Sequence, residues 1–120
     1  MTGRVYNNLI EVRQGDSFPL NFELKNSKTK KPIDLRSAIL QMQVRDKDGN
    51  LKFSLYGSDV DAEHGKMALL ISPVQTSIPV GDYVTDIQLT TNDGLVNTIF
   101  PSNVSQVGIF RVTAQVTTGA

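Results

Sequence analysis

Apolar and polar residues alternate with a period of two along most of this chain. The clearest example runs from Ser17 to Lys25, where apolar residues take every second position: Phe18, Leu20, Phe22 and Leu24. Because successive side chains of a β-strand point to opposite faces of its sheet, this pattern predicts a strand with one buried face. Pro19 belongs to the outward set and has no N–H to donate, so we expect this strand to lie at a sheet edge or to begin at that point.

The same alternation predicts further strands, separated by turn signals such as Asp48-Gly49 and Asn92-Asp93-Gly94. These strands are Leu9 to Arg13, Ala38 to Arg45, Leu51 to Tyr56, Met67 to Ile71, Gly81 to Thr90, Leu95 to Phe100 and Val104 to Val116. Met67 to Ile71 is apolar at every position, which is typical of a central strand. We expect loops at Asn26 to Lys31 and Gly57 to Gly65, and a crossing between sheets at Ser72 to Pro79.

Seven or eight short strands without any helical period predict an all-β fold, namely a two-sheet antiparallel β-sandwich. Gly81 followed by Tyr83 at the start of a late strand is the arrangement of the tyrosine corner, which favours an immunoglobulin-like sandwich over a barrel. No repeat or linker divides the chain. We therefore expect one domain over residues 1–120, with short flexible ends at about 1–8 and 117–120.

The charge balance limits the kinds of partner. Twelve basic and twelve acidic residues cancel, so no long-range field attracts nucleic acid or an acidic membrane surface. The chain contains no cysteine, and no apolar run reaches the length of a membrane span. We expect neither nucleic acid nor membrane as partner, and a protein made and kept in the cytoplasm until assembly.

The residues give little support to catalysis. With a single histidine, no cysteine and no G-x-S-x-G elbow, we expect no enzyme and no cofactor. The densest set of hard ligands is Asp59, Asp61 and Glu63, next to His64. It is a weak candidate for a divalent cation, because such ions need several converging oxygens. A solvated acidic loop is the preferred interpretation.

The outward positions of the predicted strands are polar but carry few charges. Amides and hydroxyls cost less to bury than ions, so these residues form a possible interaction face. They are Asn21, Glu23, Gln41, Gln43, Arg45, Asp86 and Gln88. The same pattern also fits ordinary solvent-facing surfaces, and the sequence leaves both interpretations open.

Several segments together resemble the immunoglobulin-like N-terminal domain of phage baseplate upper proteins and related phage tail and fibre structural proteins. They are Gln14 to Phe18 leading into L-N-F-E-L, P-I-D-L-R-S-A from Pro32, M-Q-V-R-D-K-D-G from Met42, I-P-V-G-D-Y-V-T-D-I-Q-L-T from Ile78, and D-G-L-V-N-T from Asp93. Each segment is generic by itself. Their order and spacing, from about Glu11 to Val116, carry the resemblance.

The resemblance implies a virion structural protein, a docking and assembly module of the tail, baseplate or fibre attachment apparatus. Its implied partners are other virion structural proteins, with a homo-oligomer in the assembled particle and a location in the virion. Baseplate upper proteins continue into helical and oligomerising parts that are not seen in this sequence. A head decoration or head-fibre protein, or a carbohydrate- or cell-surface-binding module, therefore stays open as an alternative.

Overall fold

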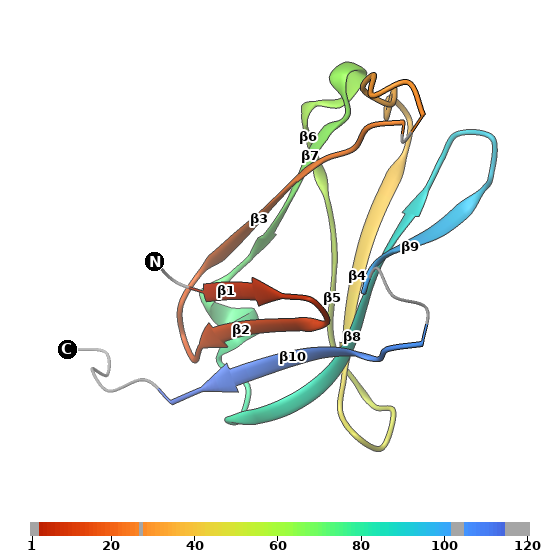
Figure 1. The fold of residues 1–120 in the computed structure, drawn as a ribbon. Coiled ribbons are helices and arrows are strands. Elements are labelled where there is room, and N and C mark those ends of the chain that lie inside the picture. The colour runs from red at the N-terminus through yellow and green to blue at the C-terminus, as the bar shows by residue number, and fades with distance from the viewer. Residues whose placement is uncertain (1–2, 27, 102–104, 115–120) are drawn as a thin grey trace.

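Ten β-strands in two stacked sheets make up most of the computed structural model, which describes residues 3–26, 28–101 and 105–114 (Figure 1). The larger sheet contains β1 (Gly3–Tyr6), β2 (Leu9–Arg13), β4 (Ile39–Arg45), β5 (Leu51–Tyr56), β8 (Gly81–Thr90), β9 (Val96–Phe100) and β10 (Gly108–Thr113). The smaller sheet contains β3 (Phe18–Glu23), β6 (Ser58–Asp61) and β7 (Lys66–Ile71). Two short helical turns, η1 (Ala62–His64) and α1 (Pro73–Thr76), flank β7.

The strand order is that of an immunoglobulin-like sandwich. The larger sheet runs β1-β2-β10-β8-β4-β5, with β9 beside β8, and the smaller sheet runs β3-β7-β6. Every pair is antiparallel except β2 and β10, which are parallel. Strands β3, β7 and β6 thus occupy the places of strands B, E and D of that fold, and β10, β8 and β4 those of G, F and C. The predicted sandwich is confirmed, although it is not purely antiparallel.

The core lies between the two sheets and follows the period-two pattern. In β8 the side chains of Tyr83, Thr85, Ile87 and Leu89 are buried, while the residues between them are half-buried. The largest fully buried side chains come from both sheets: Phe110, Ile10, Leu40, Met42, Ile87, Leu69 and Ile71. Leu35 joins them from the β3–β4 connection. The rings of Phe53 and Phe110 meet edge to face, with centroids 5.6 Å apart.

In the described residues, every buried side-chain nitrogen and oxygen atom has a hydrogen-bond partner. Thr76 is fully buried, and its hydroxyl donates to the carbonyl oxygen of Asp16 at 2.7 Å. Thr85 is also buried, and its hydroxyl donates to the carbonyl oxygen of Gln43 at 2.7 Å. Both bonds join segments far apart in sequence, so they tie the strands together while removing the cost of burying an unpaired hydroxyl.

The edge and centre assignments made from the sequence are confirmed. Strand β3, which contains Pro19, lies at an edge of the smaller sheet, and β7 lies at its centre. The outward side of β7 is open to solvent, however, because Leu70 is 63% exposed. The apolar residues at every position from Met67 to Ile71 therefore correctly indicated a central strand. They did not indicate that both faces of β7 are buried.

Several segments differ from the expectations. Gly3–Tyr6 form β1 against β2 where a flexible end was expected, and Ser58–Asp61 form β6 against β7 within the expected loop. These two strands raise the count from the predicted seven or eight to ten. All four residues of β6 are exposed, so its sequence shows no alternation of apolar and polar residues that would predict a strand. The expected flexible end at 117–120 lies outside the described residues.

The crossing from β7 to β8 contains a single helical turn that the sequence did not predict. Ser72 caps α1 by accepting a hydrogen bond from the Gln75 amide, and the Gln75 side chain accepts from the Ser72 amide in return. Pro73 takes the first helical position, where no donor is needed. One turn is too short to produce a helical period.

Gly65 ends η1 and permits close contact with the β3–β4 connection. Its φ of +79° lies in the left-handed region, and a Cβ there would collide with the carbonyl oxygen of Leu24. Gly49, in the β4–β5 turn, has a similar φ of +85° but has open space around the Cβ position.

We predict that Gly65→Ala lowers the free energy of unfolding by more than about 2 kcal/mol, because backbone strain and a steric clash add together. Gly49→Ala is the matched control and should cost only about 1 kcal/mol, since strain acts alone. Urea denaturation followed by circular dichroism measures both. Equal losses would show that Gly65 is not held against Leu24.

Candidate functional site

The seven residues of the predicted interaction face lie on two opposite surfaces of the sandwich. Asn21 and Glu23 are on β3 in the smaller sheet, and their side chains are exposed. The other five are half-buried on β4 and β8 in the larger sheet: Gln41, Gln43, Arg45, Asp86 and Gln88. The expectation of one face is therefore corrected. Alternation identifies outward positions but does not reveal which sheet a strand joins.

The five residues of the larger sheet form one contiguous patch, which we call the β4–β8 patch. In the ladder between these strands Gln43 lies opposite Asp86, and Gln41 lies opposite Gln88. The Arg45 guanidinium donates to the Gln43 side-chain oxygen at 3.1 Å and to the carbonyl oxygen of Gly49 at 3.0 Å. The five side chains thus form a continuous polar surface, in which Arg45 and Asp86 carry one charge each.

Two shallow hollows lie beside the β4–β8 patch. One, of about 330 Å³, is lined by residues of β8, β9, the β9–β10 connection and the first residue of β10. The other, of about 210 Å³, is lined by residues of β4 and β8 together with Val107. They share Thr85, Asp86 and Val107. Asp86 provides the carboxylate of this region, and Val107 is 62% exposed. A carboxylate beside amides and an exposed valine can contact a partner surface.

The β4–β8 patch continues onto β5 through residues that were not included in the predicted face. The side-chain amide of Gln41 donates to the Ser54 hydroxyl and to the Tyr56 hydroxyl, each at 3.4 Å. Tyr56 is 66% exposed. Ser54 and Tyr56 belong to the outward set of their predicted strand, so the alternation itself contained this signal.

The predicted corner formed by Gly81 and Tyr83 is present. The Tyr83 hydroxyl donates to the carbonyl oxygen of Pro79 at 2.5 Å, and its ring is buried. Gly81 has a φ of +151°, a conformation that favours glycine. Burial raises the pKa of the Tyr83 phenol above its ordinary value, with a smaller contribution from the nearby Asp46 carboxylate. The role of this residue is structural.

We predict that Tyr83→Phe lowers the free energy of unfolding by about 1 kcal/mol, because one buried hydrogen bond is lost without a change of shape. Tyr56→Phe removes the same hydroxyl from an exposed ring and should change stability by less than about 0.5 kcal/mol. Chemical denaturation of both variants gives the comparison. A Tyr83→Phe protein as stable as the parent would remove the corner bond from the account.

The acidic segment does not assemble a metal centre. Within residues 3–26, 28–101 and 105–114, no three histidine, cysteine, aspartate or glutamate side chains lie close enough to hold an ion. Asp59, Asp61 and Glu63 are all exposed. Instead, Asp61 pairs with the Nδ1 of His64 at 3.0 Å. The exposed carboxylates are thus spread along β6 and η1.

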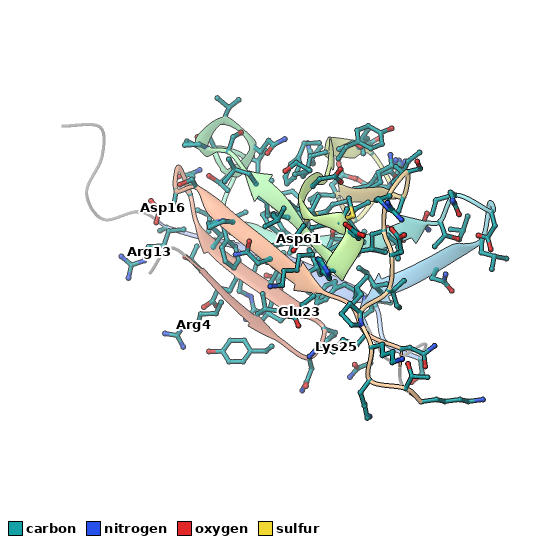
Figure 2. The ribbon with its side chains drawn as sticks, turned by 90° about the horizontal axis from the view of Figure 1, so that it is seen from above. Arg4, Arg13, Asp16, Glu23, Lys25 and Asp61 are labelled. Carbon is teal, nitrogen blue, oxygen red and sulfur yellow. The ribbon has the colours of Figure 1, made fainter. Side chains whose placement is uncertain are left out.

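Charged residues close to the acidic segment also form local ion pairs. The Arg36 guanidinium bonds to Asp34 at 2.6 Å and lowers the pKa of that carboxyl to about 2. Glu23 pairs with Lys25 at 3.2 Å. Figure 2 shows Glu23, Lys25 and Asp61 around β3 and β6, with Arg4, Arg13 and Asp16 towards the β1–β2 side. These labelled charges do not converge on one centre.

The hydrogen bond from His64 to Asp61 raises the pKa of the imidazole above its ordinary value of 6.5. A raised pKa in the folded state means that the pair stabilises the protein below about pH 6.5 and loses this effect as pH rises through the folded pKa. We predict that NMR titration of this one histidine gives a pKa above 6.5, and that Asp61→Asn lowers it. The exposed Asp59→Asn is the control. An unchanged pKa in Asp61→Asn would exclude the pair.

By its fold, the protein belongs to the class of immunoglobulin-like β-sandwiches. Comparisons of the chain with protein-family models and with curated protein sequences find no match. Among solved structures, the crystal structure of CopC from Methylosinus trichosporium OB3b is similar, with 15% sequence identity and a TM-score of 0.42. The similarity covers 65% of this chain and 65% of that one. In the part of this chain that the structure describes, no helix is long and apolar enough to cross a membrane.

Proposed function

We propose that this protein is a phage virion structural module, a β-sandwich that docks onto other proteins of the tail, baseplate or fibre apparatus. The order and spacing of the sequence segments that resemble phage baseplate domains motivate the setting. The β4–β8 patch carries the docking role, because it is a contiguous polar surface on the open side of the larger sheet.

The chemistry of the patch suits a contact between proteins. Gln41, Gln43 and Gln88 are amides, which can exchange hydrogen bonds with water for bonds with a partner at low cost. Arg45 already donates to Gln43, so one of its hydrogen-bond donors is satisfied before a partner arrives. Polar groups of this kind determine the orientation of a bound partner more than the affinity of the contact.

A repeated particle does not require strong single contacts. When many copies sit on one assembly, linked weak contacts together give stable attachment. The near-neutral charge of the chain fits this role, since neighbouring copies do not repel one another strongly.

The proposal predicts that mass spectrometry of purified phage particles finds this protein at many copies. A double variant, Gln41→Lys with Gln88→Lys, should reduce its incorporation at least about tenfold, because two like charges that lie opposite each other would have to be desolvated at the contact. Asn21→Lys, on the opposite face, is the control and should be incorporated normally. Circular dichroism verifies that the variants fold.

Absence of the protein from particles would refute the virion role. Normal incorporation of the double variant would exclude the β4–β8 patch as the docking surface. Binding of the isolated protein to a glycan array, together with its absence from particles, would favour the carbohydrate-binding alternative.

A further inference from the structure

Four charged residues of alternating sign form a row across β1, β2, β10 and the start of β8, which we call the charge row. Arg4 of β1 lies opposite Glu11 of β2, and Glu11 lies beside Arg111 of β10. Arg111 in turn lies opposite Asp82 of β8. In β2 and β10 the residues directly before and after these charges are fully buried, so the charges point outward. Figure 2 shows Arg4 on this outer side of the molecule.

An apolar row lies next to the charge row on the same outward face. Tyr6 lies opposite Leu9, Leu9 lies beside Ile109, and Ile109 lies opposite Val84. Tyr6 is 46% exposed, and the other three residues are half-buried. Apolar residues together with tyrosine and arginine are the composition that protein interfaces favour.

Two sets of hydrogen bonds hold the charged side chains in place. The Arg111 guanidinium donates to both carboxylate oxygens of Asp82, at 2.8 and 3.1 Å. The Arg4 guanidinium donates to the Tyr6 hydroxyl at 2.6 Å. The side chains of Arg111 and Asp82 nevertheless remain 43% and 42% exposed. A partner therefore meets charges that are already ordered, which lowers the entropy cost of binding.

We propose that this face stacks on the same face of a second copy of this chain, with a two-fold axis that runs parallel to the strands between β2 and β10. Sheets that stack face to face lie about 10 Å apart with nearly aligned strands. The rotation reverses the order of the strands. Arg4 of each copy then faces Asp82 of the other, and Glu11 faces Arg111.

The apolar row meets itself in the same arrangement. Tyr6 of each copy faces Val84 of the other, and Leu9 faces Ile109, because these residues lie on the same four strands in the same order. Every contact in the two rows thus joins opposite charges or apolar groups. The rows cover only part of one sheet, so we expect a weak dimer.

The order of the charges selects this orientation. An axis along the row would place each charge opposite its own copy, and four like-charge contacts would result. The outward row of the smaller sheet differs, because Glu23, Lys66 and Asp61 alternate over three positions. Reversal of that row still places acid on acid and lysine on lysine. The even number of charges in the larger sheet is what makes its row complementary to itself.

The same alternation disfavours a partner of uniform charge. A polyanion or an acidic membrane surface would be attracted by Arg4 and Arg111 but repelled by Glu11 and Asp82. None of the residues of the two rows belongs to the β4–β8 patch. The pairing therefore goes beyond the proposed docking role and does not depend on it.

Exchange of charges between two variants tests the arrangement. Arg4→Glu places a glutamate opposite Asp82 twice per dimer, and Asp82→Lys places a lysine opposite Arg4 twice. Sedimentation equilibrium from about 10 µM to about 1 mM should show the parent protein forming dimers and each variant dimerising roughly tenfold more weakly. An equimolar mixture of the two variants restores opposite charges at both contacts. Native mass spectrometry of the mixture should show a heterodimer, with an affinity within about threefold of the parent dimer.

Glu23→Lys is the matched control, because it changes the charge as Asp82→Lys does but lies on the smaller sheet. It should dimerise as well as the parent protein. The three substituted residues are exposed, so the variants should fold, and circular dichroism verifies this.

A parent protein that stays monomeric up to about 1 mM would overturn the inference. Failure of the mixed variants to form the heterodimer would overturn the proposed orientation, and an equal loss of dimerisation in Glu23→Lys would overturn the choice of face. These outcomes are distinct from those for the virion role: a dimer that is absent from particles would refute that role alone, and a monomer found in particles would refute the pairing alone.

Discussion

The whole structure depends on one apolar interior that is closed by two sheets at once. Leu40, Met42 and Phe110 come from the larger sheet, while Leu69 and Ile71 come from the smaller one, and all are fully buried. Neither sheet could bury its apolar face alone, because a sheet hydrophobic on one side needs a second layer. With no disulfide available, this burial must supply most of the stability. The corner of Tyr83 and the buried hydroxyl of Thr76 then fix the loops at the ends of the strands, and the hydroxyl of Thr85 ties β8 to β4.

Because alternate side chains fill the interior, the remaining half of each strand is free to serve another purpose. On the larger sheet that half forms the β4–β8 patch, which continues through Ser54 and Tyr56 to the edge of β5. The proposed docking surface therefore lies on the outward face of the larger sheet. Docking through this face, as proposed, requires no cavity or reactive group.

The sequence predicted those parts of the fold that bury a face. Strands β3, β4 and β8 were readable because their inward residues repeat strictly every second position. Strand β6 was not, because its pairing depends on the free edge of β7 and leaves all its own side chains exposed. The same reason explains the error in the predicted interaction face. Asn21 and Gln43 look alike in sequence, and only the pairing of β3 with β7 and of β4 with β8 places them on opposite surfaces.

Hydrogen exchange of backbone amides is the most direct test of the shared interior. If the two sheets are held by one core, the central amides of β4, β8 and β10 should exchange with the same free energy as those of β7, equal to that of global unfolding. Exchange of the β7 amides at a free energy several kcal/mol lower than that of the β8 amides would contradict the account, because the smaller sheet would then open independently of the larger one.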